Sequence, residues 1–276
     1  MTHMIYVVPS LKAKEKLQCE GKAWAESQGF AYVPRGKRTI QDLMDEYGED
    51  FLVYSSRGPQ IDRPEGSHFF SLNMAELRIQ NLRKGQRDHL LEALMGVKEY
   101  DLRPAAAQPP ISVLDCTCGF GADAAVASFG LPAGSRVDAL EVSPLLEAVT
   151  AWGFSHFVHK KDDVTAALRR ISLRCGDYRD YLLSDDGPVY DVLYFDPMFQ
   201  RPVEASCQFQ PVRAIMEHGG LTRDLIERAL QKARCRVVIK ERDFRQLCRD
   251  FPDVALYGGK YSRIGYAVLE CDSWKK

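Results

Sequence analysis

The sequence lacks a long apolar segment and a recognisable leader. No uncharged apolar run approaches the roughly 18 residues that a membrane-spanning helix needs. The first ten residues contain no basic stretch followed by a long apolar core, so we expect no signal peptide. These absences predict a cytoplasmic protein that does not cross a membrane.

A clear excess of charge of either sign is also missing. The chain has 37 Lys and Arg against 38 Asp and Glu, which gives a formal net charge of −1. Proteins that coat nucleic acid through bulk electrostatics usually carry a positive excess. The composition argues against that class but leaves a local basic patch open.

The eight cysteines form no C-x-x-C pair and no repeated spacing. Only Cys116 and Cys118 lie close together, and a C-x-C pair without a second Cys or His pair is a poor zinc site. We interpret the cysteines as reduced thiols and expect no bound metal. The sequence leaves the oligomeric state open.

The length of the chain predicts more than one structural unit, and the order of its strand and helix patterns predicts an α/β protein. The 276 residues suffice for one large domain and a smaller one. A proline-rich stretch, LRPAAAQPP, predicts a linker before residue 111. We therefore expect a small N-terminal α/β domain over 1–72, a basic helix and linker over 73–110, and a larger domain over 111–276.

The N-terminal part alternates short apolar runs with helical patterns. We expect Ser10 to cap a helix that ends near Gln28, and Thr39 to cap a second helix through Tyr47. Glycines and prolines between Gly58 and Gly66 predict a loop. Strands are expected over residues 4–8, 30–33, 51–54 and 68–72.

From Ile111 onward the pattern predicts a doubly wound, mostly parallel sheet. The last two strands have no helix between them, so they should form an antiparallel hairpin at its edge. The expected strands span 111–115, 136–140, 171–174, 189–195, 236–239, 254–257 and 264–269. The expected helices span 122–129, 144–152, 222–233 and 244–249.

A glycine-containing turn follows the first of these strands, in the sequence ISVLDCTCGFGAD. Gly119 and Gly121 would let backbone N–H groups approach a ligand closely before the next helix begins. Glu141 ends the second strand 20 residues after Gly121, where an acid can accept both hydroxyls of a ribose. This arrangement fits either a nicotinamide dinucleotide or S-adenosylmethionine, although similar turns occur in α/β proteins without cofactor.

One comparison between the two cofactors is weak. Ala124 stands where a dinucleotide turn has its third glycine, but alanine is tolerated there, so this position decides little. Two other details favour S-adenosylmethionine. The pattern D-x-x-x-G-x-G over Asp115 to Gly121 and the expected hairpin ending resemble the class I S-adenosylmethionine-dependent methyltransferases, with a Rossmann-like fold. The resemblance covers residues 111–276 and implies that Asp115 meets the amino-acid end of the cofactor.

A four-residue motif follows the fourth strand: Asp196, Pro197, Met198 and Phe199. It resembles the (D/N)-P-P-(Y/F/W) motif of methyltransferases that act on exocyclic or amide nitrogens. Hydrogen bonds to the Asp196 carboxylate and the Pro197 carbonyl would localise the lone pair of such a nitrogen. Phe199 would stack on the target base. Met198 replaces the second proline of the motif, and an Asp-Pro turn that merely ends a strand is the alternative.

Five segments of the chain together resemble the RsmJ family of small-subunit ribosomal RNA guanine-N2 methyltransferases. They are, in order, the basic RIQNLRKGQRDH, then LDCTCGFGADA, ALEVSP, YFDPMFQ and RVVIKERD. Where that family has Arg before the acid of the turn, this chain has Ala122, and the resemblance is weak before residue 70. It implies cofactor contacts at Ala122, Asp123, Glu141, Val142, Asp177, Tyr178 and Asp196.

Basic side chains gather in two places and could contact RNA phosphates. Both sets could equally be ordinary solvated charge. The residues 200–210 could close over the base or form a plain surface loop. The candidate substrate-binding residues are Arg78, Arg83, Lys84, Arg87, Lys240 and Arg242.

The sequence thus predicts an S-adenosylmethionine-dependent N-methyltransferase, with guanine N2 of ribosomal RNA as the expected target and the small ribosomal subunit or its RNA as partner. One alternative is methylation of another nitrogen, in DNA adenine or a protein amide. Another is a noncatalytic RNA-binding module that keeps the fold.

Overall fold

The structure is a computed structural model that describes residues 4–100, 108–197, 220–258 and 264–271. The chain folds into two compact units. Among the described residues, the first unit comprises 4–71 and 143–157, and the second comprises 72–100, 108–142, 158–197, 220–258 and 264–271. The expected division at residues 72, 110 and 111 stays a prediction.

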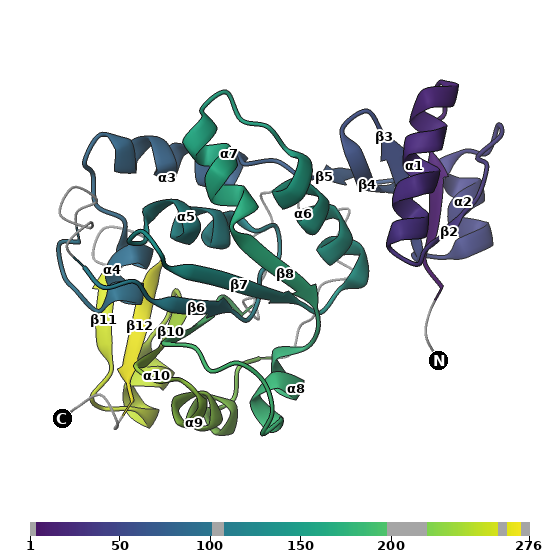
Figure 1. Cartoon of the computed structure of the whole chain (residues 1–276). Helices are drawn as coiled ribbons and strands as arrows, with labels where there is room; N and C mark the ends of the chain where they lie inside the picture. Colours follow the sequence, from purple (N-terminus) through teal and green to yellow (C-terminus); the bar gives the residue numbers. More distant parts are fainter. Residues whose placement is uncertain (1–3, 101–107, 198–219, 259–263, 272–276) are drawn as a thin grey trace. The chain divides into compact units, whose positions relative to one another are not determined.

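The first unit contains a five-stranded sheet in the order β2-β1-β3-β4-β5 (Figure 1). β1 pairs in parallel with β2 and β3, whereas β3, β4 and β5 form antiparallel pairs. Its strands are β1 (Tyr6–Pro9), β2 (Ala31–Tyr32), β3 (Phe51–Ser55), β4 (Gly58–Arg63) and β5 (Gly66–Phe69). Its helices are α1 (Glu15–Ser27), α2 (Ile40–Tyr47) and α6 (Pro144–His156).

One predicted helix start in this unit is confirmed and two other predictions are wrong. Thr39 caps α2 through a capping box with Asp42, as its sequence indicated. Ser10 does not cap α1, which begins at Glu15 after an N-cap residue, Lys14, that makes no side-chain cap hydrogen bond. The expected loop from Gly58 to Gly66 instead holds β4, because pairing with β3 and β5 outweighs its glycine and proline content.

Helix α6 belongs to the first unit although it follows a strand of the second. It packs on β4, and the ring of Phe70 lies edge-on to that of Phe154 with centroids 5.7 Å apart. A Cβ atom on Gly153 would lie 1.9 Å from the Phe70 ring. Glycine at this position therefore allows helix and ring to touch.

The second unit contains a seven-stranded sheet in the order β11-β12-β10-β9-β6-β7-β8 (Figure 1). Its first five strands along the chain pair in parallel, and β12 pairs antiparallel with both β10 and β11. This is the predicted mostly parallel sheet with an antiparallel C-terminal hairpin. The strands are β6 (Ser112–Asp115), β7 (Arg136–Glu141), β8 (Ile171–Cys175), β9 (Val192–Phe195), β10 (Arg236–Glu241), β11 (Ala255–Gly258) and β12 (Gly265–Glu270).

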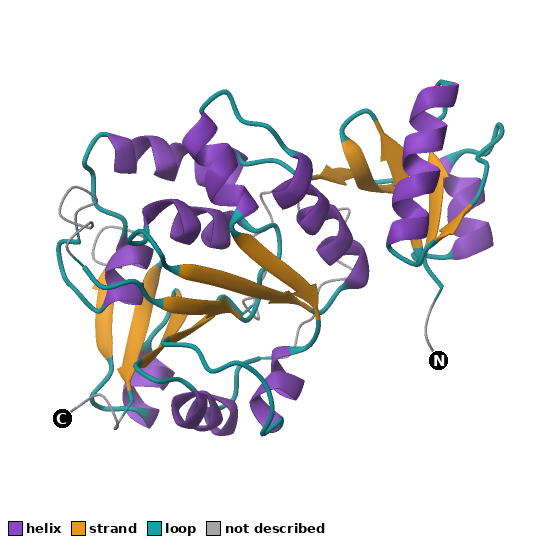
Figure 2. Ribbon diagram, in the orientation of Figure 1, coloured by secondary structure: helices purple, strands orange, loops and turns teal. Residues whose placement is uncertain are grey.

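Helices cover both faces of this sheet (Figure 2). One face carries α4, α5 and α7, with α3 packed on α5, and the other carries α8, α9 and α10. The bounds are α3 (Asn73–Arg83), α4 (His89–Met95), α5 (Ala122–Gly130), α7 (Asp162–Arg169), α8 (Tyr178–Leu183), α9 (Arg223–Lys232) and α10 (Arg245–Asp250). Among the described residues, no helix has the length and apolar character needed to cross a bilayer.

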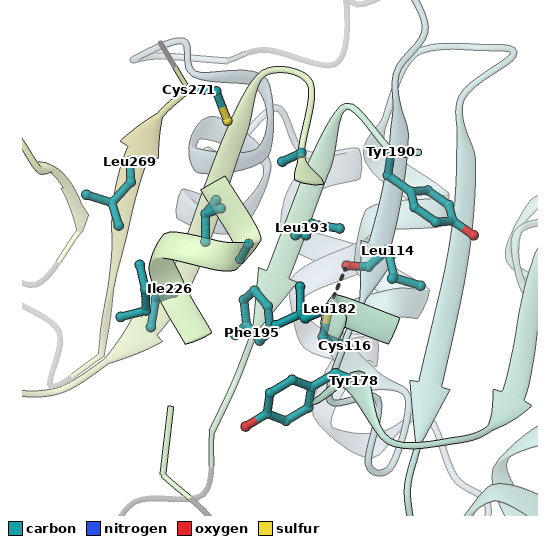
Figure 3. Packing of buried hydrophobic residues seen from close by; sticks show 14 of the residues in the cluster. Leu114, Cys116, Tyr178, Leu182, Tyr190, Leu193, Phe195, Ile226, Leu269 and Cys271 are labelled. Atoms are coloured by element: carbon teal, nitrogen blue, oxygen red, sulfur yellow. Dashed lines mark hydrogen bonds between the residues drawn. The ribbon is translucent and has the colours of Figure 1, made fainter. Parts of the chain in front are cut away.

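The core on the α8, α9 and α10 face is built from alternate residues of the parallel strands. Leu193 and Phe195 of β9 are fully buried there, and the Tyr178 ring stands edge-on to Phe195 at 5.4 Å between centroids (Figure 3). Alternation sends Tyr194 and the position of Asp196 to the opposite face. Alternation along β9 thus places the core residues on one face of the sheet and the candidate active-site residues on the other.

Three features of this unit differ from expectation or sharpen it. The sequence interpretation missed α7 and α8, which are only eight and six residues long. The helical pattern that starts at Asn73 breaks near Gly85, which has a positive φ of 75°. A new helix, α4, then starts behind Asp88, whose side chain caps it.

Candidate active site

The turn after β6 is shaped by two glycines with positive φ. Gly119 has φ of 53° and Gly121, the N-cap of α5, has φ of 74°. Among the described residues, a Cβ atom on Gly119 would meet nothing closer than a backbone oxygen at 3.9 Å. The positive φ therefore explains the glycine, and the described residues leave space beside it.

Glu141 lies at the end of β7 and reaches this turn. Its Oε2 accepts a hydrogen bond of 2.8 Å from the Gly119 N–H, and the residue is buried. The strand pairing of β6 with β7 brings the two together, as their positions at the carboxyl ends predicted. An acid therefore stands at the open side of the glycine turn.

Asp196 follows β9 on the other side of β6. Its backbone N–H donates to Thr117 Oγ1 at 2.7 Å, which ties the residue to the same turn. Its side chain is 29% exposed, and Oδ2 lies 2.7 Å from Lys240 Nζ. Within the part of the chain that the structure describes, no donor reaches Oδ1, so this oxygen can accept a hydrogen bond from a substrate.

Lys240 connects Asp196 to the acid of the turn. Its Nζ lies 2.8 Å from Asp123 Oδ2, and the Tyr194 hydroxyl donates to that same oxygen at 2.8 Å. The other oxygen of Asp123 pairs with Arg78 of α3. Arg78 in turn donates two hydrogen bonds of 2.8 Å to Asp88. Carboxylates and cationic side chains thus alternate in one series of ion pairs, from Asp88 at the start of α4 to Asp196.

Burial and neighbouring charges move the pKa values of the carboxyls in opposite directions. Burial raises the pKa of Asp115 well above its ordinary value, and Asp123 reinforces this. Burial also raises the pKa of Asp196, although Lys240 acts against it. At Asp123 burial is overcome by Lys240 and Arg78, so its pKa is lowered. Asp123 is the firmly ionised member of the group.

Comparison with known proteins decides the family. The family model of SAM-dependent methyltransferases, where SAM is S-adenosylmethionine, matches residues 76–264, more than half of the chain. The chain belongs to this methyltransferase family. Its cofactor is therefore S-adenosylmethionine.

The chain is similar in sequence to two curated proteins and in fold to a solved structure. The methyltransferase is 28% identical over 85% of its length to the uncharacterized protein YpiP of Bacillus subtilis, of which 88% is covered. It is 34% identical to ribosomal RNA small subunit methyltransferase J of Saccharophagus degradans, over 56% of this chain and 61% of that protein. The crystal structure of a SAM-dependent methyltransferase from Neisseria gonorrhoeae is similar in fold, with a TM-score of 0.62, 17% identity, and coverage of 97% and 96% of the two chains.

The residues present in the methyltransferase fit its cofactor. Open space at Gly119 can take a ligand against the backbone, and Glu141 offers carboxylate oxygens beside it. Carboxyl groups of Asp115, Asp123 and Asp196 gather at this end of the sheet, where their oxygens can accept hydrogen bonds from a bound ligand. Ala122 opens α5 directly after the turn.

The other expected cofactor contacts lie at the ends of β7 and β8. The Val142 carbonyl faces Cys175 Sγ at 3.9 Å. Asp177 caps α8 and holds Arg179 with hydrogen bonds of 2.8 to 2.9 Å, whereas the Tyr178 ring is buried in the core. The backbone of Tyr178, at the start of α8, is the part of this residue that follows the end of β8.

Four of the expected substrate-binding side chains form ion pairs with carboxylates in the structure. Arg78 and Lys240 are in the ion pairs described above, and Arg83 pairs with Asp163. Arg87 lies 2.5 Å from Glu92 and 3.4 Å from Glu99. Lys84 and Arg242 are exposed. Sequence reasoning placed Arg78 and Lys240 at the RNA and did not anticipate their contacts with Asp123.

Three parts of the expected site lie outside the described residues: Met198, Phe199 and the segment 200–210. Among the described residues, no cluster of His, Cys, Asp and Glu suits a metal ion. Sequence reasoning also missed Thr117 as the partner of the Asp196 N–H. The contact between Lys240 and Asp196 could have been predicted. β9 and β10 were expected as consecutive strands, and Asp196 and Lys240 lie at their carboxyl ends.

Proposed function

We propose that this methyltransferase modifies the exocyclic N2 of a guanine in the RNA of the small ribosomal subunit, acting in the cytoplasm. The carrying observation is the position of Asp196. Its Oδ2 is held by Lys240, its N–H is held by Thr117, and its Oδ1 faces no donor within the described residues. Relatives named ribosomal RNA small subunit methyltransferase J support the RNA substrate.

In the proposed reaction, Asp196 Oδ1 and the Pro197 carbonyl accept hydrogen bonds from the N–H groups of the amine. The lone pair of an aromatic amine is delocalised into the ring, and these bonds favour the geometry in which it is localised. S-adenosylmethionine, when bound, would supply the methyl group to the amine nitrogen and leave as the neutral thioether, and the proton that the nitrogen loses would pass to solvent. The protein contributes chiefly by positioning and electrostatics.

The proposed cofactor contacts are the side chains of Asp115, Asp123, Glu141 and Asp196, together with the turn from Gly119 to Ala122 and the strand ends at Val142, Asp177 and Tyr178. Phe199 is proposed to stack on the base. Lys84 and Arg242 are exposed and are proposed to contact RNA phosphates. Arg83 and Arg87 can contribute if RNA replaces their carboxylate partners.

The function is tested by comparing nucleosides, by mass spectrometry, in small-subunit RNA from cells with and without this protein. We expect N2-methylguanosine at one position to disappear in the deletion strain and to return with the wild-type gene. Loss of a methylated adenosine instead, or of a methylated amide in a ribosomal protein, would replace the guanine assignment with that target. Unchanged modification in both RNA and protein would contradict the proposal.

We predict that Glu141→Ala weakens S-adenosylmethionine binding by about 10-fold to 100-fold, since charge-assisted hydrogen bonds contribute about 1.5 to 3 kcal/mol. Isothermal titration calorimetry measures this directly. Glu141→Gln keeps an acceptor for the Gly119 N–H, so its affinity for S-adenosylmethionine should lie between those of the wild type and Glu141→Ala. Equal affinities for all three proteins would remove Glu141 from the cofactor site.

A further inference from the structure

Lys240 is the last but one residue of β10, beside the strand that carries the catalytic motif. β9 and β10 pair in parallel, with Ile239 opposite Phe195, so Lys240 and Asp196 are the next residues along each strand. Both follow Tyr194 and Val238 on the face of the sheet that carries α5. The two side chains therefore point the same way from adjacent strand ends.

The Lys240 ammonium group is enclosed by acids. The side chain is 14% exposed, and Nζ lies 2.7 Å from Asp196 Oδ2 and 2.8 Å from Asp123 Oδ2. An ammonium group has three N–H donors, so two of them are committed to carboxylates inside the protein. Little of this charge is left for an RNA phosphate at the surface.

We propose that Lys240 is a positioning residue for methyl transfer: it holds Asp196 by Oδ2, keeps that carboxylate ionised, and leaves Oδ1 to accept the amine N–H. This inference rests on the proposed function. Through Asp123, the same ammonium group ties the catalytic motif to the first turn of α5, where the cofactor turn ends. The Lys240 side chain thus fixes the position of the Asp196 carboxylate relative to the turn that is proposed to bind the cofactor.

The surroundings show why Asp196 needs this cation. Asp123 from α5 and Glu241 from β10 add negative charge around Asp196, and the hydroxyls of Tyr194 and Tyr266 line the same space as Lys240. Burial and Asp123 favour the neutral form of Asp115 from β6, so Asp115 adds little charge. Arg78 is directed to Asp123 and Asp88. Without Lys240, Asp196 would be a partly buried carboxylate beside other acids, and its neutral form would be favoured.

The test is the pH dependence of kcat/KM for Lys240→Met and Lys240→Arg, with small ribosomal subunits from the deletion strain and labelled S-adenosylmethionine. The wild type should gain activity as pH rises through the Asp196 pKa. In Lys240→Met this acid limb should move upward by about one to three pH units, since an opposite charge at this distance lowers a carboxyl pKa by that amount. Lys240→Arg should keep the limb within about half a unit, because its charge remains.

A second readout does not depend on activity. In the full chain labelled with ¹³C at the Asp carboxyls, the Asp196 signal is assigned by its loss in Asp196→Asn and titrated by NMR. The Asp196 pKa should be higher in Lys240→Met than in the wild type. Lys22→Met, which removes an exposed α1 lysine paired with Glu26 at 3.9 Å, should leave both readouts unchanged.

The outcomes separate the inference from the function on which it rests. A wild type that methylates no subunit would contradict the proposed function, and the NMR titration would still decide the Lys240 contact. An active wild type with a Lys240→Met variant that is slower at every pH, with the acid limb and the Asp196 titration unmoved, would overturn the inference. If Lys240→Met does not fold, Lys240→Gln replaces it, with the same upward shift expected.

Discussion

Asp196→Ala should lower the rate constant of methyl transfer by about 100-fold to 1,000-fold, the usual cost of losing one preorganised polar contact in the transition state. The variant loses the acceptor for the amine N–H. Lys240 keeps Asp123 as a partner at 2.8 Å, so the fold and the cofactor turn should persist. Single-turnover transfer of labelled methyl to small ribosomal subunits measures the rate, and calorimetry should show S-adenosylmethionine affinity within a few-fold of the wild type.

Two further variants make that result interpretable. Asp196→Asn keeps the shape and one carbonyl oxygen but removes the charge, so it should retain more activity than Asp196→Ala. Asp253→Ala, at an exposed aspartate remote in sequence from the motif, should be as active as the wild type. Transfer by Asp196→Ala at the wild-type rate would show that the assigned mechanism is wrong.

Asp123→Ala should destabilise the second unit by about 3 kcal/mol, the lower end of the cost of breaking a buried ion pair. Asp123 is buried and accepts from Arg78, Lys240 and Tyr194. The loss stays at the lower end because Arg78 retains Asp88 and Lys240 retains Asp196. Urea unfolding of the full chain, followed by circular dichroism, measures the change.

The matched control is Asp163→Ala, which removes the partner of Arg83 at the surface. Both side chains of that pair are substantially exposed, 35% for Arg83 and 55% for Asp163. We expect a loss below about 1 kcal/mol there. Equal losses in the two variants would show that the buried pairs add nothing beyond a surface pair.

The sign of the pH dependence follows from the lowered pKa of Asp123. Its contribution to stability should be complete above its unfolded pKa of about 3.9 and should decline as pH falls from there towards the folded value. The difference in unfolding free energy between the wild type and Asp123→Ala should therefore shrink on acidification below about pH 4. A difference that is constant with pH would assign the effect to packing.

The parts of the site that follow from strand order were predictable. Each β–α turn starts at the carboxyl edge of a parallel sheet, so an acid at the end of a strand faces the ligand side. Glu141 and Asp196 could be placed in this way, and they lie on either side of the turn at Gly119. The family resemblance added the cofactor and the expected chemistry.

The pairing of charges could not be derived from order alone. Arg78 and Lys240 stand in basic stretches, which usually face solvent. Their contacts with Asp123 depend on how α3 packs on α5 and on which face β10 presents, and neither is visible in a local pattern. Tyr178 was similarly ambiguous, since a residue after a strand can point to the ligand or into the core.

Local sequence signals misled the prediction elsewhere. Gly58 and Pro59 suggested a loop, yet pairing with β3 and β5 makes their segment a strand. α8 has six residues and starts directly after Asp177, so it offers too few turns for a helical period to be recognised. Tertiary pairing decided the first segment, and shortness hid the second.

The membership of α6 in the first unit bears on how the chain is made. A ribosome releases the polypeptide from its N-terminus, so the five strands of the first unit emerge well before residues 143–157. Until then β4 lacks the helix that packs on it, and the Phe70 ring lacks the groove at Gly153. The first unit can complete its packing only after β6 and β7 of the second unit have been synthesised, so its last folding step comes after part of the second unit has already emerged.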